Sequence, residues 1–207
     1  EIVYPLPSLT LDNLQQVFDI STLGSINKPF ILFNSSIVAR KRVEKTINYF
    51  KRSNLPDREF FLCIAGKIHK NPYGNMVREI CEGNKNILLL DYVNELEKVW
   101  LFLNASHLLS TSSIEGFGVP VLDALSINLP TLASNIPTYR EIKKMRSNNK
   151  LELLEISEEI NWIKHLNNIE SFDFKESKNK KERIDYFQNF IEKLEVNNIN
   201  KIKTYFD

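Results

Sequence analysis

The stretch FFLCIAG, Phe60 to Gly66, is a continuous run of apolar residues that ends in glycine. Such a run is typical of a strand with both faces covered, as in a parallel sheet packed between two layers of helices. Similar runs predict further strands at residues 30–33, 86–93, 107–113 and 130–134. Apolar residues at helical spacing predict helices at 42–52, 75–81, around 99–103, at 119–127 and from Pro137 onward.

Strands that alternate with helices predict an α/β fold, a Rossmann-like doubly wound parallel sheet. Right-handed crossovers between parallel strands place helices on both faces of such a sheet. Its ligands bind outside the carboxyl ends of the strands. The loops where we expect functional residues are therefore 34–41, 66–74, 91–94, 111–119 and 134–138.

The composition predicts a folded protein without a strong overall field. Of 207 residues, 43% are hydrophobic and 26% charged, unlike a disordered chain. The 27 basic and 26 acidic residues leave a net charge of +1, so a nucleic acid partner is not expected. No run approaches the roughly 18 apolar residues of a membrane span, and the opening EIVYPLPSLT lacks the features of a signal peptide. We expect a cytoplasmic protein, with Cys63 and Cys81 reduced and buried.

The chain divides into three segments by pattern. Residues 1–28 carry several prolines and little periodicity, which predicts an interdomain connector. Residues 29–170 hold the alternating strands and helices and form the predicted Rossmann-like domain. Residues 171–207 are rich in Lys, Glu and Asn but repeat apolar residues at helical spacing, which predicts a charged amphipathic helix docked on the domain. The charge run from Lys178 to Arg183 is interpreted as its solvated face.

The loop after the fourth predicted strand has the chemistry of an anion site. Gly116 and Gly118 let the backbone approach a ligand closely, and Pro120 suits the first turn of a helix. The free N–H groups of such a turn favour a phosphate. Glu115, in the same loop, is suited to accept hydrogen bonds from sugar hydroxyls. Asp123, eight residues later, offers a second acceptor on the following helix.

EGFGVPVLDAL, residues 115–125, followed by NLPTLAS, residues 128–134, resembles the nucleotide-sugar site of glycosyltransferase family 4. The resemblance implies the C-terminal, donor-binding half of a two-domain GT-B fold. In it, Glu115 would hydrogen-bond the donor sugar and Asp123 would hold the ribose. The backbone facing the sugar and the diphosphate would be that of Gly116, Phe117, Gly118 and Val119.

Within residues 115–134, two residues depart from the pattern of that family. Asp123 replaces a glutamate and is one methylene shorter. Asn128 replaces a glycine at the end of the helix, and asparagine is the residue next best able to adopt the left-handed conformation needed there.

Basic residues follow the first predicted strand in NSSIVARKRVEKTINYF, residues 34–50. Cations at the carboxyl edge can neutralise charge on a departing nucleoside diphosphate. The loop resembles the basic loop of the same family, which implies Lys41 as the first diphosphate ligand and Arg40 as the second.

Two further loops resemble donor-site loops of the family. Gly66-Lys67 is similar to a pair that lies near the donor phosphates, so Lys67 is a further candidate. The turn with Tyr92 and Val93 resembles one whose backbone meets the nucleotide base, although Asp91 replaces the glycine of that turn.

The resemblance implies a retaining glycosyltransferase that transfers a sugar from a nucleoside diphosphate sugar, of UDP or GDP type, to a glycan or lipid-linked acceptor. It implies no cofactor and no metal, an acceptor bound through an N-terminal domain not present in this sequence, and an enzyme of polysaccharide biosynthesis in contact with the inner face of the membrane. This fragment alone should bind nucleotide without transferring sugar.

Two other functions stay open. In many members of the family the basic loop begins with Gly-Arg, which Asn34 and Ser35 replace here. The substitutions at Ser35, Asp91 and Asp123 suit a non-catalytic Rossmann-like binding or scaffold domain with a degenerate site. A sugar-nucleotide epimerase of similar fold would need further acids and a catalytic histidine. The three histidines, His69, His107 and His165, lack suitably spaced partners and are expected to be structural.

Overall fold

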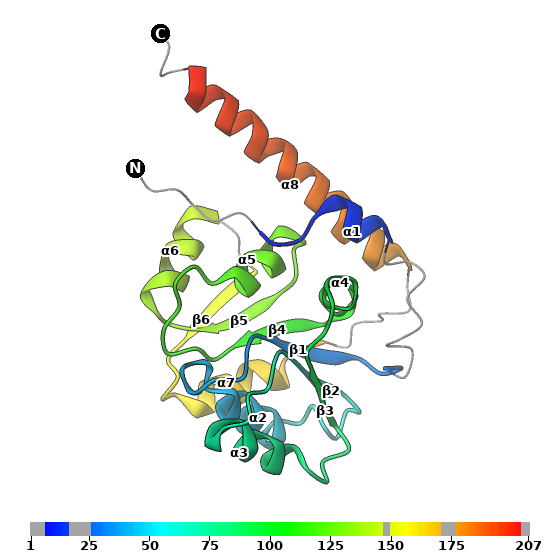
Figure 1. The fold of residues 1–207 in the computed structure, drawn as a ribbon, viewed down its shortest axis with the longest axis vertical. Coiled ribbons are helices and arrows are strands. Elements are labelled where there is room, and N and C mark those ends of the chain that lie inside the picture. Colours follow the sequence, from blue (N-terminus) through cyan, green and yellow to red (C-terminus); the bar gives the residue numbers. More distant parts are fainter. Residues whose placement is uncertain (1–6, 17–25, 147–149, 171–176, 204–207) are drawn as a thin grey trace.

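The computed structural model describes residues 7–16, 26–146, 150–170 and 177–203, and its centre is a parallel sheet (Figure 1). The six strands follow the order β3-β2-β1-β4-β5-β6. Their bounds are β1 Phe30–Asn34, β2 Phe61–Ala65, β3 Ile87–Asp91, β4 His107–Ser110, β5 Thr131–Ser134 and β6 Leu151–Leu154. Every pairing between neighbouring strands is parallel. The predicted α/β, Rossmann-like sheet is therefore confirmed.

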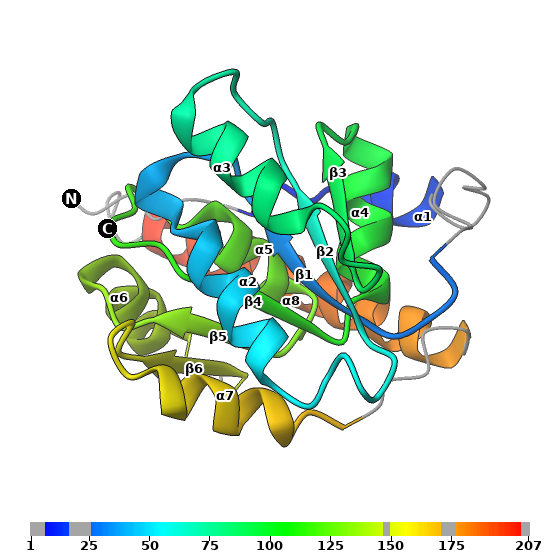
Figure 2. The same ribbon diagram turned by 90° about the horizontal axis from the view of Figure 1, so that it is seen from below.

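Helices cover both faces of the sheet (Figures 1 and 2). One layer consists of α1 (Leu11–Gln16), α4 (Glu95–Asn104), α5 (Val119–Ser126), α6 (Pro137–Arg146) and α8 (Ser177–Lys203). The other consists of α2 (Val43–Arg52), α3 (Pro72–Cys81) and α7 (Glu159–Asn167), with the 3₁₀ helix η2 (Ala39–Lys41) before α2.

Strand β1 shows why the sheet needs both layers. Phe30 and Leu32 belong to the core under α4 and α5, whereas Ile31 and Phe33 belong to the core under α2 and α3. All four side chains are buried. Because successive strand residues point to opposite faces, an uninterrupted apolar run is what a two-sided sheet requires. Cys63 in β2 is likewise buried, and its thiol and that of Cys81 are free.

Several elements differ from the sequence expectations; η2, for example, lies in the expected loop 34–41. β6 and α1 were not expected, and α1 lies within the predicted connector, with Leu9 and Leu14 buried in the core. α3 begins at Pro72 rather than Asn75, because the Asn71 side chain accepts a hydrogen bond from the N–H of Gly74 (2.8 Å) and caps the first turn. Residues 1–6 and 17–25 of the predicted connector lie outside the described residues.

The C-terminal segment contains the long helix α8, which packs beside α1, α4 and α5 (Figure 1). Ile184 and Phe187 on its inner face are buried. The solvated face predicted for the run ending at Arg183 is wrong for Arg183 itself. Its guanidinium is buried and donates to the carbonyls of Phe102 (3.0 Å), Leu103 (2.8 Å) and Ala105 (3.0 Å) at the end of α4.

Parts of the predicted C-terminal segment, residues 171–207, are not described by the structure. Residues 171–176 and 204–207, and the side chains of Lys178 and Leu194, lie outside the described part. None of the helices in the described residues is both long and apolar enough to cross a bilayer.

Candidate functional site

The strand order places two loops side by side at the carboxyl edge of the sheet. From β1 the chain crosses towards β2 and β3, whereas after β4 it continues towards β5 and β6. β1 and β4 are hydrogen-bonded neighbours, so the loops that follow them diverge from one point. A ligand crevice is expected at such a switch in strand order.

Hydrogen bonds join these two loops directly. The N–H of Ser113 donates to the carbonyl of Arg40 (2.8 Å). The Thr111 hydroxyl donates to the carbonyl of Arg42 (2.8 Å) and lies 2.9 Å from the hydroxyl of Thr46 in α2. The loop after β1 is thus fixed against the loop after β4.

The two loops bring Lys41 and Glu115 into a buried ion pair. The Lys41 ammonium donates to Glu115 Oε1, and the side chains are only 6% and 7% exposed. The Ser112 hydroxyl (2.6 Å) and the Tyr139 hydroxyl (3.2 Å) donate to the same oxygen. Three donors from three parts of the chain therefore converge on one carboxylate oxygen.

Burial and hydrogen bonding act in opposite directions on the pair. Burial alone would raise the pKa of Glu115. The hydrogen bonds from Lys41 and Ser112 outweigh burial, so the pKa of this carboxyl lies below its usual value. Burial lowers the pKa of Lys41 more than the hydrogen bond and charge of Glu115 raise it.

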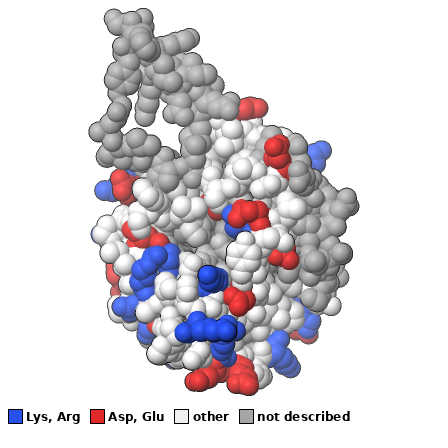
Figure 3. All heavy atoms as spheres, in the orientation of Figure 1, with Lys and Arg blue, Asp and Glu red and all other residues white. Residues whose placement is uncertain are grey.

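Arg40 lies at the open side of this pair. Its Nη1 is 3.5 Å from Glu115 Oε2 and 3.4 Å from the carbonyl oxygen of Ile114, and half of its side chain is exposed. Glu115, Lys41 and Arg40, the residues expected at the donor sugar and its diphosphate, therefore come together. Figure 3 shows both signs of charge on the face seen in Figure 1.

Gly118 and the start of α5 follow Glu115 directly in the chain and form the turn beside it. Gly118 has a φ of 68° and is the N-cap of α5, followed by Val119 and Pro120. A Cβ on Gly118 would lie 2.8 Å from Cε1 of Tyr139, so a larger residue would be both strained and crowded. Phe117 projects outward with 63% of its surface exposed. The N-terminus of α5 supplies partial positive charge next to the basic loop.

Asp123 occupies a different environment from the one predicted. It is buried on α5, and its two oxygens accept hydrogen bonds from the N–H (2.5 Å) and the hydroxyl (2.6 Å) of Ser8. Burial raises the pKa of Asp123 against the lowering effect of these bonds. Contact of Asp123 with a ribose stays a prediction; in this structure each of its oxygens accepts one hydrogen bond from Ser8.

The other predicted donor-binding residues lie farther along the same edge. Tyr92 and Val93 follow the edge strand β3; Tyr92 is mostly exposed, and Val93 packs partly against the core. Lys67, after β2, is exposed, and no hydrogen bond or ion pair among the described contacts joins its side chain to Glu115. Asp91, where the family has glycine, has a φ of 56° and accepts from the N–H of Ile68 (2.8 Å).

The expectation for the end of α5 is confirmed, because Asn128 has a φ of 58°. Sequence reasoning missed Ser112 and Tyr139 as partners of Glu115. A signal for Tyr139 existed: it follows the loop 134–138, which was already expected at this edge. A serine three residues before a glutamate is too common to single out Ser112.

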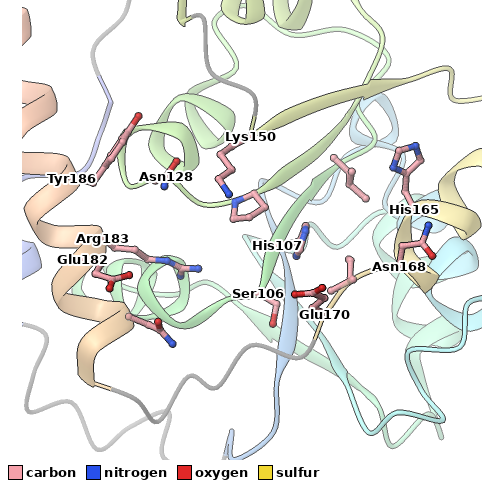
Figure 4. Close-up of a pocket in the computed structure, with 14 residues that line it drawn as sticks. Ser106, His107, Asn128, Lys150, His165, Asn168, Glu170, Glu182, Arg183 and Tyr186 are labelled. Carbon is pink, nitrogen blue, oxygen red and sulfur yellow. The ribbon is translucent and has the colours of Figure 1, made fainter.

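A cavity of about 600 Å³ lies at the opposite, amino-terminal edge of the sheet (Figure 4). Ser106 and His107 at the start of β4, Lys150 before β6 and Arg183 of α8 line it. Burial, with Arg183 and Lys150 nearby, lowers the pKa of His107 to about 4. The cavity is separated from Glu115 by the length of β4, so it is not part of the site above.

The chain is similar to known glycosyltransferases. Residues 23–171 match the family model described as glycosyl transferases group 1. The serotype-specific mannosyltransferase WbdA of Escherichia coli is 26% identical over 138 residues, which are 63% of this chain and 16% of WbdA. The chain therefore spans only about a sixth of that relative.

Solved structures show the same fold. WaaG, a glycosyltransferase involved in lipopolysaccharide biosynthesis, aligns with a TM-score of 0.64 at 14% identity, over 92% of this chain and 51% of WaaG. The C-terminal domain of the group 1 glycosyl transferase LpcC from Francisella tularensis aligns with a TM-score of 0.58 at 14% identity, over 92% and 95% of the two chains. The sheet is thus that of the C-terminal half of a GT-B fold, and the chain belongs to the glycosyl transferases group 1 family.

Proposed function

We propose that this chain is the donor-binding half of a retaining glycosyltransferase that uses a nucleoside diphosphate sugar of UDP or GDP type. The observation that carries the proposal is the buried Lys41–Glu115 pair beside the Gly118 turn, at the point where the strand order reverses. There an acceptor for sugar hydroxyls, two cations and a helix N-terminus lie together.

Each group has a distinct task in this proposal. Glu115 accepts hydrogen bonds from the donor sugar, because an ionised carboxylate is an acceptor only. Arg40, Lys41 and the start of α5 lie where the diphosphate would leave, and they neutralise the charge that develops on it. The protein groups are already fixed by the contacts between the two loops, so little reorganisation accompanies the reaction.

The proposed reaction also needs a site for the acceptor. The similarity to WbdA, a mannosyltransferase, and to WaaG supports a glycan or lipid-linked acceptor. The chain covers about half of WaaG, so we place the acceptor on the other half of the whole enzyme. A lipid-linked acceptor would bring that enzyme to the cytoplasmic face of a membrane.

Calorimetric titration of the 207-residue chain with UDP and with GDP tests the donor site. We expect one of the two to bind, and Lys41→Met to weaken it at least about tenfold, because a charge-assisted contact is lost. Lys51→Met is the matched control, since Lys51 is exposed on α2 and donates only to the carbonyl of Ile80 (3.0 Å) among the described contacts. A folded sample that binds neither nucleotide would rule out the donor site.

One observation favours the alternative of a non-catalytic domain. Ser8 donates hydrogen bonds to both oxygens of Asp123, the residue expected to hold the ribose. The two functions separate in the full-length enzyme. In a sample shown to be folded, Glu115→Ala should abolish sugar transfer if the chain is catalytic, and it should leave the binding of other partners unchanged if the chain is a scaffold.

A further inference from the structure

Two residues in the first turn of α6 hydrogen-bond to Glu115, one to its main chain and one to its side chain. The Thr138 hydroxyl donates to the main-chain carbonyl of Glu115 (2.8 Å). The Tyr139 hydroxyl donates to the carboxylate at Oε1 (3.2 Å). Because β5 lies next to β4, the helix that follows β5 begins beside the Glu115 loop.

Tyr139 itself has almost no freedom to move. Its side chain is completely buried, and its hydroxyl lies 2.5 Å from that of Ser110, the last residue of β4. Its ring packs beneath Gly118, at the distance that excludes a Cβ there. One side chain thus supports both the carboxylate and the glycine turn.

The two oxygens of the Glu115 carboxylate differ in their partners. Oε1 receives Lys41, Ser112 and Tyr139, whereas the described contacts of Oε2 reduce to Arg40 at 3.5 Å. Rotation about the last bond of a glutamate is intrinsically soft, so the carboxylate plane depends on its donors. With Oε1 held by three donors, Oε2 is the oxygen left to accept a ligand hydroxyl.

We infer that Tyr139, supported by Ser110, is a positioning residue that fixes the rotation of the Glu115 carboxylate so that Oε2 faces the donor sugar. This inference rests on the proposed function. Tyr139 acts through Glu115, so its removal should affect recognition of the sugar and not that of the diphosphate.

The test compares dissociation constants for a nucleoside diphosphate and for its sugar form, using UDP with UDP-glucose and GDP with GDP-mannose. In Tyr139→Phe the ring still fills the space beneath Gly118, and only the hydroxyl is lost. We expect the sugar form to bind about fivefold more weakly, the scale of one hydrogen bond, while the diphosphate binds as before. Ser110→Ala should give a smaller change in the same direction.

A pH series adds a readout that a merely structural role would not move. The Tyr139 hydrogen bond helps to keep the pKa of Glu115 low, so its loss should raise the pH below which the sugar form no longer binds. Tyr49→Phe is the matched control: Tyr49 is equally buried, donates to the carbonyl of Ile156 (2.6 Å) and stacks on Trp162 away from the site.

Three outcomes decide the matter. A selective loss for the sugar form in Tyr139→Phe, absent in Tyr49→Phe, supports the inference. The inference is overturned if both Tyr139→Phe and Ser110→Ala leave unchanged the ratio of the dissociation constants of the sugar form and the diphosphate, and also the pH midpoint for binding of the sugar form. The proposed donor site would not be affected by that result. A wild-type chain that binds none of the four ligands overturns the donor site and this inference together.

Discussion

Lys41 is a buried cation whose charge is balanced by the Glu115 carboxylate beside it. Removing one member of a buried pair leaves the other charge uncompensated, which costs more than the pair contributes. The Lys41→Met variant should therefore lose about 3 kcal/mol of unfolding free energy. Urea denaturation monitored by tryptophan fluorescence measures this loss.

The double variant Lys41→Met with Glu115→Gln is the control for this prediction. It should recover most of the lost stability, because neither charge remains buried. It should not recover affinity for nucleoside diphosphate. A double variant as unstable as Lys41→Met alone would contradict the view that the two charges balance each other.

At this scale the sequence predicted the residues and not their partners. Glu115, Arg40 and Lys41 were found because each lies in a motif after a strand, and the alternating pattern places such loops at one edge. The contact of Ser8 with Asp123 joins residues 115 positions apart, and no local pattern encodes it. Tyr139 directly follows the loop 134–138, but its place in the sequence does not show that its hydroxyl donates to Glu115.

Among the elements, α8 is joined to the end of α4 by the buried side chain of Arg183. Arg183 satisfies three carbonyls that the last turn of α4 leaves without helical partners. Arg183→Met should remove about 3 kcal/mol of stability, since buried acceptors lose a charged donor. Hydrogen exchange should show faster exchange in residues 177–191 of α8.

Lys181→Met is the matched control, because Lys181 is exposed on the same helix. Its stability and exchange should equal those of the wild type. If α8 exchanges equally fast in both variants, Arg183 does not fasten it. The charge run misled the sequence interpretation here because a helical stripe of charges cannot reveal which member meets the carbonyls of another helix.

For the whole molecule, His107 links stability to pH. Burial lowers its pKa from 6.5 to about 4 in the folded state, where Arg183 and Lys150 also face it. Between these values the unfolded chain binds more protons, so stability rises with pH through this window and is lost as pH falls. The expected loss from pH 7 to pH 4 is about 3 kcal/mol from this residue.

Denaturation at a series of pH values checks this, with His107→Gln as the variant and His69→Gln, in the loop after β2, as the control. The slope between about pH 6.5 and 4 should flatten in His107→Gln and persist in His69→Gln. Equal slopes in wild type and His107→Gln would show that other groups carry the pH dependence.

The order of elements could be predicted for most of the molecule, from β1 to α6. Buried strands such as β2 can be predicted because their apolar runs are uninterrupted. β6 was not predicted because it is short, lies at the sheet edge and contains the exposed Glu152. Its sequence pattern therefore does not distinguish a strand from a helix. The position of β4 beside β1, which creates the site, is a property of the strand order and not of any single segment.

The central claim is that a nucleoside diphosphate binds between the loops after β1 and β4. Its most direct test is an amide NMR titration of the isotopically labelled chain with UDP and GDP. We predict saturable shifts at Arg40, Lys41 and residues 116–119. Shifts confined to the amino-edge cavity around His107, or none at all in a folded sample, would contradict the claim.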